Sequence, residues 1–317
     1  MSSHQFSIAQ PEQVYKRINE LSKRSSEFQS RLAQPLKKLW DPLRNLACVN
    51  NLSVFSELYE RFPNFIEVIQ FYEVNAIALK RLNQPFEAYP VLLQGDPGLG
   101  KTYFVSELAR VLGLSFYEIS LATTTANFAI SGGSTQWGDG STGFVANSLV
   151  DSAIANPIML IDEIDKASHL GNYNPMTPFY SLLEPHSAKR FKDEALEIEL
   201  DTSKIIWIAT SNYMHQIPEP IQSRMRTFKI DKPTVKHMPK IINSIYQNMR
   251  THKVYGQMLT NNVNLELIDY LSNKTPREIK QSLEAGVMSA IKQNRDYLVV
   301  SDLPVYKDKE VHRVGFL

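Results

Sequence analysis

Eight consecutive residues have the types and spacing of a phosphate-binding loop. Glycines let backbone N–H groups turn toward phosphate oxygens, a lysine adds positive charge for the β- and γ-phosphates, and a threonine hydroxyl can bind Mg²⁺. The apolar run VLLQ precedes this loop, and the helical stretch YFVSELARVLGL, which begins at Tyr103, follows it. The positive end of that helix dipole would face a triphosphate, so the segment predicts an ATP site that includes Tyr103. The loop residues are Gly95, Asp96, Pro97, Gly98, Leu99, Gly100, Lys101 and Thr102, which match GxxxxGK[ST].

A pair of acidic residues follows a second apolar run, NPIMLI. Asp162 and Glu163 come directly after this run, where a buried strand would place both carboxylates at the phosphate end of a sheet. We expect Asp162 to hold Mg²⁺ through water and Glu163 to polarise the attacking water. The run IDEIDK would also suit the charged first turn of a helix. The phosphate-binding loop upstream favours the catalytic interpretation.

Three more polar side chains lie downstream. The run IIWIAT leads to Asn212, whose amide could orient the attacking water or sense the γ-phosphate, although asparagine after a strand is also a common turn residue. The segment IPEPIQSRMRTF places Arg224 and Arg226 at the end of a short helix. One of them could reach a phosphate across a subunit boundary, because a planar guanidinium neutralises charge that develops on the γ-phosphoryl group. A pair of surface arginines before a strand is the plainer alternative.

The elements that must position these residues alternate between short β-rich runs and helical stretches. VLLQ, SFYEI, IMLI, IIWIA and TFKI are the strand candidates, and their alternation with helices predicts an α/β fold with a parallel sheet. Helical spacing of apolar residues predicts further helices before residue 83 and over residues 235–249, 265–271 and 277–292. The expected organisation is a helical N-terminal segment (1–61), an α/β nucleotide-binding domain (62–232), a small helical lid domain (233–298) and a C-terminal tail (299–317).

The composition excludes several classes of protein. The chain has 317 residues, 34 Lys and Arg against 33 Asp and Glu, and one cysteine, Cys48. A net charge of +1 gives no attraction of the whole chain to nucleic acid or an anionic membrane. A single cysteine excludes an intrachain disulfide and a thiolate-rich zinc site. The N-terminus lacks the pattern of a signal peptide, and no apolar run approaches the length of a membrane span. We therefore expect a cytoplasmic protein without membrane or nucleic-acid partners.

Several segments, taken in order, resemble those of AAA+ ATPases. GDPGLGKT, IMLIDE, ATSN, IPEPIQSRM and TPREIKQ are similar to the Walker A, Walker B, sensor 1, arginine-finger and sensor 2 segments of that family, over roughly residues 62–295. The resemblance is strongest to the ATPase module of Lon proteases, whose patterns NPLxLLDEIDK and IPxPLLDRM correspond to NPIMLIDEIDK and IPEPIQSRM. It implies the P-loop AAA+ fold with a helical lid, ATP and Mg²⁺ as cofactors, and a homo-oligomeric, hexameric ring. It also implies that Arg224, or else Arg226, is a finger acting on the neighbour's nucleotide, and that Arg277 contacts nucleotide from the lid.

In unfoldases related to Lon, a loop after the second strand carries an aromatic residue that grips polypeptide in the pore of the ring. The corresponding stretch is ISGGSTQWGDGSTG, with Trp137 followed by Gly138. A Gly- and Ser-rich loop with one large aromatic suits such a moving paddle. A Trp137 side chain tucked into the core is the alternative.

Departures from the Lon pattern limit what the resemblance implies. Lon proteases continue past the lid into a peptidase domain with a Ser–Lys dyad, whereas this sequence ends soon after residue 295, so we expect ATPase activity without an intrinsic peptidase. Asp96 stands where proline is common, with little expected effect on catalysis. The preferred function is a motor that remodels or unfolds protein, as a chaperone or for a separate peptidase. The alternatives are a DNA-associated ATPase of the clamp-loader or initiator type, which the near-neutral charge disfavours, and a partner-specific assembly factor whose client is chosen by the N-terminal helices.

Overall fold

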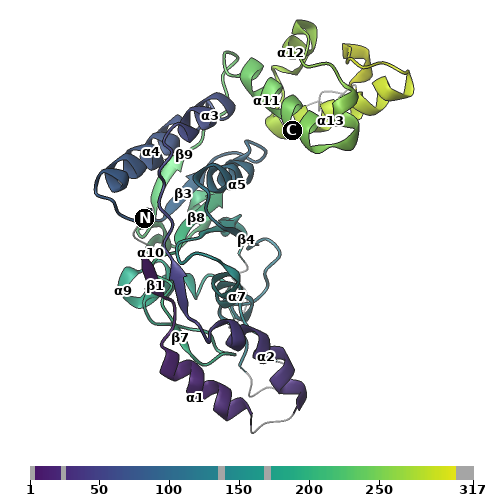
Figure 1. Cartoon of the computed structure of the whole chain (residues 1–317). Helices are drawn as coiled ribbons and strands as arrows, with labels where there is room; N and C mark the ends of the chain where they lie inside the picture. Colours follow the sequence, from purple (N-terminus) through teal and green to yellow (C-terminus); the bar gives the residue numbers. More distant parts are fainter. Residues whose placement is uncertain (1–3, 23–25, 135–139, 168–172, 305–317) are drawn as a thin grey trace, which may run out of the picture. The chain divides into compact units, whose positions relative to one another are not determined.

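The computed structural model describes residues 4–22, 26–134, 140–167 and 173–304 (Figure 1). The chain divides into two compact units, Met1–Asp231 and Lys232–Leu317, which are described separately. None of the helices within the described ranges has both the length and the apolar character needed to cross a membrane.

A five-stranded parallel sheet forms the centre of the first unit. Its strand order is β4-β5-β8-β3-β9, and the strands coincide with the β-rich runs of the sequence, so the predicted α/β fold with a parallel sheet is confirmed. The three inner strands are almost wholly buried, as expected for a parallel sheet covered on both faces. The strands are β3 (Val91–Gln94), β4 (Phe116–Ser120), β5 (Ile158–Asp162), β8 (Ile206–Ser211) and β9 (Arg226–Lys229).

Alternate residues of the inner strands contribute to two hydrophobic cores, one on each face of the sheet. Leu92, Met159 and Trp207 belong to one core, whereas their neighbours Leu93 and Ile158 belong to the other, because successive side chains of a strand point to opposite faces. The second core is covered by α3 (Val54–Arg61), α4 (Ile66–Arg81) and α5 (Lys101–Leu112). The first core is covered by α1 (Pro11–Leu21), α2 (Ser26–Lys38), α7 (Phe144–Asp151) and α8 (Phe179–Leu182).

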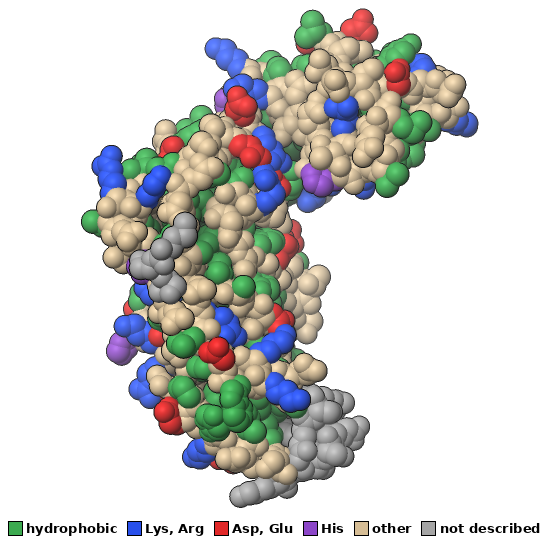
Figure 2. Space-filling view, viewed as in Figure 1, with side chains coloured by type: hydrophobic (Ala, Val, Ile, Leu, Met, Phe, Trp, Pro, Cys, Tyr) green, Lys and Arg blue, Asp and Glu red, His purple; other side chains and the backbone are tan. Residues whose placement is uncertain are grey.

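The N-terminal segment is packed onto the unit that contains the sheet. Helices α1 and α2 lie near α7, at the opposite end of the unit from α3 and α4 (Figure 1), and their apolar side chains Val14, Leu21 and Leu36 are part of the first core. On the outer side, Tyr15 and Trp40 are about half exposed, with ring centroids 4.4 Å apart. Figure 2 shows apolar side chains gathered over these helices, at the lower end of the view.

Short elements complete the first unit. They include two antiparallel pairs, β1 (Gln5–Ser7) with β2 (Leu43–Asn45) and β6 (Phe191–Lys192) with β7 (Glu199–Leu200). The short helices are α6 (Phe128–Ser131), α9 (Pro185–Ala188) and α10 (Glu219–Gln222), and the 3-10 turns are η2 (Ile164–Lys166) and η3 (Met214–Gln216).

The second unit is helical and has its own hydrophobic core. Helix α13 begins with a capping box in which Thr275 and Glu278 satisfy each other's backbone N–H groups, as its TPRE sequence favours. Helix α11 begins three residues later than predicted because Pro239, in its first turn, lacks an N–H to bond the carbonyl of Val235. The elements are α11 (Met238–His252), η4 (Val254–Met258), α12 (Leu265–Leu271), α13 (Pro276–Lys292) and η5 (Val300–Asp302).

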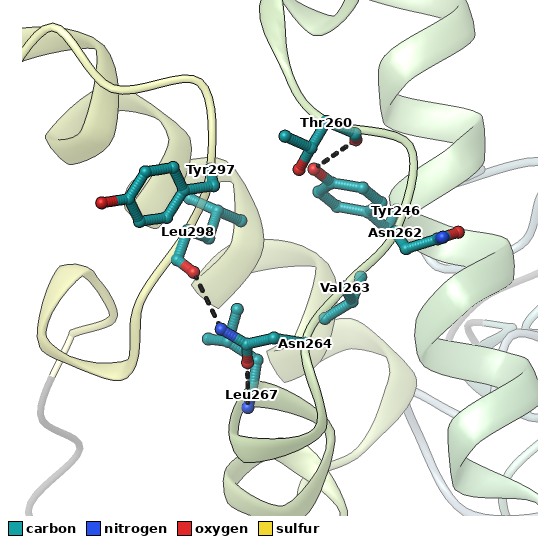
Figure 3. A pocket seen from close by; sticks show the side chains of 8 residues that line it. All are labelled: Tyr246, Thr260, Asn262, Val263, Asn264, Leu267, Tyr297 and Leu298. Atoms are coloured by element: carbon teal, nitrogen blue, oxygen red, sulfur yellow. Dashed lines mark hydrogen bonds between the residues drawn. The ribbon is translucent and has the colours of Figure 1, made fainter.

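The second unit also contains a small, open hollow of about 190 Å³, lined by residues including Tyr246, Asn264 and Tyr297 (Figure 3). The Tyr246 hydroxyl donates a hydrogen bond to the carbonyl of Thr260 (3.0 Å), and the Asn264 amide donates to the carbonyl of Leu298 (3.2 Å). These polar groups hold the walls of the hollow together, so they do not indicate a ligand.

Candidate nucleotide-binding site

The predicted phosphate-binding loop connects the end of β3 to the start of α5. Gly98 and Gly100 have φ angles of 82° and 88°, in the left-handed region that favours glycine. Gly95 lies against Ile230, the residue after β9, where a Cβ would overlap the backbone oxygen of Ile230. Gly98 and Gly100 therefore allow the left-handed backbone of the loop, and Gly95 allows its close packing. Lys101 is the first residue of the helix α5.

Lys101 connects this loop to the third strand of the site. Its side-chain ammonium donates hydrogen bonds to the carbonyls of Gly95 (2.7 Å) and Asp96 (3.0 Å) and to Oδ1 of Asn212 (2.9 Å). Only 7% of the residue is exposed. Burial lowers the pKa of Lys101, and the negative charge of Asp162 and other nearby acids opposes this effect. A bound phosphate would replace these protein oxygens as the acceptor of hydrogen bonds from the Lys101 ammonium. Lys101 would therefore exchange one set of hydrogen-bond partners for another rather than become ordered from a free side chain.

Asp162 and Thr102 provide an oxygen pair suited to Mg²⁺. The Thr102 hydroxyl donates to Oδ1 of Asp162 at 2.7 Å, and the Thr210 hydroxyl donates to the same oxygen at 2.7 Å. Hydroxyl and carboxylate oxygens are ligands that Mg²⁺ accepts together with water and phosphate oxygens, so these residues fit the ion that the sequence implies. When bound with nucleotide, Mg²⁺ would neutralise charge on the phosphate oxygens.

Glu163 has an unusual backbone conformation immediately after β5. Its φ and ψ are 52° and 49°, in the left-handed region that non-glycine residues adopt mainly where surrounding contacts hold them. Its N–H donates to the hydroxyl of Thr210 at 2.9 Å. Thr210 thus contacts both members of the acidic pair, the carboxylate of Asp162 and the backbone N–H of Glu163.

Asn212 is held from two sides. Its side chain accepts from Lys101, while its N–H and that of Tyr213 donate to the carboxylate of Asp165 at 3.2 and 3.1 Å. Asp165 is 3% exposed, so this is a buried carboxylate that fixes the turn after β8. Sequence reasoning singled out neither Asp165 nor Thr210, although both lie within the runs IDEIDK and IIWIAT. Their residue types and positions in the sequence do not distinguish them from an ordinary strand threonine and an ordinary first-turn aspartate.

Tyr103 and the two candidate finger arginines lie outside this cluster of contacts. The Tyr103 hydroxyl accepts from Arg61 at 2.5 Å. Arg224 donates to the carbonyl of Pro220 at 2.5 Å, and its Nε lies 3.4 Å from a carboxylate oxygen of Glu184. The roles of Tyr103 and Arg224 toward nucleotide stay predictions.

The other sequence-predicted residues have different positions. The Arg226 guanidinium stacks over the rings of Phe71 and Phe228, at 4.9 and 5.2 Å from their centroids. Arg277 is exposed in the first turn of α13, in the second unit. Trp137 and Gly138 lie outside the residues that the structure describes. The structure therefore brings together the predicted residues of the loop, the acidic pair and Asn212.

Comparisons with known proteins agree with this geometry. Residues 91–233 match the family model "ATPase family associated with various cellular activities (AAA)". Lon protease of Fusobacterium nucleatum is 26% identical over 69% of this chain and 28% of its own length, and the peroxisomal Lon protease homolog 2 of Zea mays is 32% identical over 53% and 19%. The chain thus spans about a quarter of the length of the first Lon relatives that it matches.

Two solved structures share the fold. A closed-state reconstruction of Hsp104 with ATPγS and FITC casein matches with a TM-score of 0.61 and 17% identity, over 86% of this chain and 50% of that one. A mutant of Thermotoga maritima RuvB matches with a TM-score of 0.52 and 17% identity, over 75% and 67%. The family match, the parallel sheet and the loop at its edge lead to one conclusion: residues 91–233 form an AAA ATPase domain, similar in sequence to the ATPase region of Lon proteases.

Proposed function

We propose that this chain is an ATP-hydrolysing motor that remodels or unfolds protein, working as a ring, with hexamers as the expected form. The observation that carries the proposal is the contact between Lys101 and Asn212 beside the Thr102–Asp162 pair. These residues lie at the ends of adjacent strands β3, β5 and β8, which supports roles for Lys101 as a phosphate-binding cation, for Thr102 and Asp162 as an Mg²⁺ site and for Asn212 as a water-orienting amide. Their convergence supports hydrolysis of ATP with Mg²⁺ rather than nucleotide binding alone.

The residues have separable roles in this proposal. Lys101 binds the β- and γ-phosphates, Thr102 and Asp162 hold Mg²⁺, Glu163 polarises the attacking water and Asn212 orients it. Arg224 of a neighbouring subunit would neutralise charge on the γ-phosphate, and Arg277 would contact the nucleotide from the lid. The similarity to Lon proteases supports polypeptide as the substrate, whether for refolding, assembly of a partner or delivery to a separate peptidase. The likeness to RuvB, at 17% identity, concerns the fold alone and does not favour DNA.

Steady-state hydrolysis and nucleotide binding by two variants test the chemistry. Lys101→Ala should weaken ATP binding itself. Glu163→Gln should keep ATP affinity within about threefold of the unaltered protein and lose about 10²–10⁴-fold in kcat, the range typical of a general base. Normal turnover by Glu163→Gln would refute its assigned role.

The substrate class is tested by adding either unfolded casein or duplex and single-stranded DNA to the unaltered protein. Stimulation of ATP hydrolysis by casein and not by DNA is the expected result. Stimulation by DNA alone would overturn the proposed protein substrate in favour of the DNA-associated alternative.

A further inference from the structure

A buried carboxylate closes the turn between β6 and β7. Asp193 is 0% exposed, and its Oδ1 accepts hydrogen bonds from the N–H groups of Ala195 (3.0 Å) and Leu196 (2.9 Å) within the same turn. Its Oδ2 accepts from the N–H of Gly143, the residue just before α7, at 2.9 Å. One carboxylate therefore fixes its own turn and a distant segment together. Burial raises the pKa of Asp193, while these N–H groups oppose that effect.

The distant segment is the one that runs from α6 to α7, and the structure describes both of its ends. A Cβ on Gly143 would overlap the backbone nitrogen of Gly132, so the two ends are in close contact. The N–H of Gly133 donates to the carbonyl of Ser141 at 2.9 Å. Glu194, in the Asp193 turn, donates its N–H to the carbonyl of Ser131 at 2.9 Å. The turn is thus attached to the segment at both of its ends.

The same turn is held on its other side by the N-terminal helix α1. Arg17 is 3% exposed, and its guanidinium donates to the carbonyl of Ala195 at 3.1 Å and lies 2.9 Å from a carboxylate oxygen of Glu197. Two further contacts reinforce this attachment: the N–H of Glu199 donates to the Gln13 side chain (2.9 Å), and the N–H of Asp201 donates to the carbonyl of Ile8 (2.9 Å).

We propose that Arg17 and Asp193 are positioning residues that couple the N-terminal helices to the base of the segment between α6 and α7. Through them, the packing of α1 against the Asp193 turn sets how firmly the two described ends of that segment are held. The functional effect of this coupling rests on the proposed function, because it assumes that the segment between α6 and α7 contacts polypeptide. The coupling itself consists of hydrogen bonds from Arg17 to Ala195 and from Gly143 to Asp193. These hydrogen bonds do not depend on that assumption.

Hydrogen exchange measured by mass spectrometry on the full-length protein tests the coupling directly. Asp193→Asn replaces one carboxylate oxygen by an amide, and Arg17→Met removes the guanidinium while keeping an unbranched side chain. Glu197 is 37% exposed at its side chain, so water can solvate its charge in the Arg17→Met variant. Lys16→Met and Glu194→Gln are matched controls, since both alter an exposed charge at a neighbouring position.

We expect Asp193→Asn to raise exchange about tenfold or more in peptides covering residues 131–150, because a hydrogen bond to a carboxylate is lost. Arg17→Met should raise exchange in the same peptides, although the guanidinium of Arg17 bonds to Ala195 and pairs with Glu20 and Glu197, outside these peptides. The double variant should show no greater rise than Asp193→Asn alone, Arg17→Lys should be intermediate, and the controls should match the unaltered protein. A rise confined to α1 and residues 193–201 in Arg17→Met, or an equal rise in β3 and β8, would overturn the coupling.

ATP hydrolysis stimulated by unfolded casein supplies the second readout. Arg17→Met and Asp193→Asn should keep the basal kcat and the KM for ATP while losing most of the stimulation, and Arg17→Lys should restore part of it. Retention of full stimulation by both variants would overturn the coupling. If casein fails to stimulate the unaltered protein, the proposed function fails while hydrogen exchange still decides the coupling.

Discussion

Replacing Thr210 tests how the acidic pair of the nucleotide site is positioned. Thr210 is 1% exposed, donates to Asp162 at 2.7 Å and accepts from the N–H of Glu163 at 2.9 Å. Thr210→Val keeps the shape and the β-branched side chain, which suits an inner strand. It removes both hydrogen bonds, because a methyl group takes the place of the hydroxyl.

The expected magnitude follows from these two bonds. Hydrogen bonds to charged groups contribute about 1.5–3 kcal/mol, and leaving a buried N–H unpaired costs about 1–3 kcal/mol. Because Thr102 still donates to Asp162, we expect the free energy of unfolding to fall by about 2–4 kcal/mol rather than by the full sum. Glu163 would also lose the contact that holds its left-handed backbone, so kcat should fall about 10–100-fold, or about 1.4–2.7 kcal/mol in the activation barrier. The KM for ATP should change little, since the contacts of Lys101 are untouched.

Thermal unfolding and steady-state ATP hydrolysis on the same preparations measure both effects. Thr210→Ser is the matched control, because it keeps the hydroxyl and loses only a methyl group. We expect it to retain most of the turnover. A Thr210→Val protein with unaltered kcat would refute the reasoning that this hydroxyl positions Glu163, whatever its stability.

Three further predictions concern other parts of the molecule. Mixing Arg224→Ala with Lys101→Ala subunits should restore part of the ATPase activity, because some interfaces then combine an intact loop with an intact finger; mixed rings without activity would contradict action across the interface. Trp137→Ala should keep basal hydrolysis and thermal stability but lose remodelling of casein, whereas early melting, as expected on truncating a buried Trp at a cost of about 3–5 kcal/mol, would favour the core alternative. The hydrogen bonds from Arg295 hold the pKa of Asp302 at about 2, below its usual 3.8; this stabilisation is complete at pH values well above 3.8 and is lost as the pH falls toward 2. Acid unfolding of the second unit, measured by hydrogen exchange, should therefore begin at a higher pH in the Arg295→Met variant than in the unaltered protein.

The strands of the sheet could be predicted from local sequence because each is a short β-rich run between helices. The meeting of Lys101, Asp162 and Asn212 also follows from the sequence once the sheet is parallel, since the carboxyl ends of parallel strands share one edge. The order of the strands in the sheet could not be predicted in this way. Placement of β8 between β5 and β3 depends on contacts between distant segments, and no spacing within a single run encodes it.

Two residues that hold the site together were missed for a related reason. Thr210 accepts a hydrogen bond from the N–H of Glu163 and donates one to Asp162, and Asp165 accepts hydrogen bonds from the N–H groups of Asn212 and Tyr213. A threonine in a strand is favoured by its β-branched shape alone, and an aspartate in a first turn is favoured by the helix dipole. Their sequence context is thus fully explained without a role in the site, and only the three-dimensional register reveals one.

The contact between Arg17 and the turn that contains Asp193 extends this argument to the whole N-terminal segment. The sequence spacing predicts several amphipathic helices before residue 83, yet nothing in that spacing indicates which surfaces they cover. Arg17 stands among residues of an amphipathic helix, where a charged side chain ordinarily faces solvent. Its burial instead reflects a partner 178 residues away in the sequence, the carbonyl of Ala195. The N-terminal segment, to which sequence reasoning assigned a role only in the assembly-factor alternative, is therefore the one that the structure joins to the base of the α6–α7 connection.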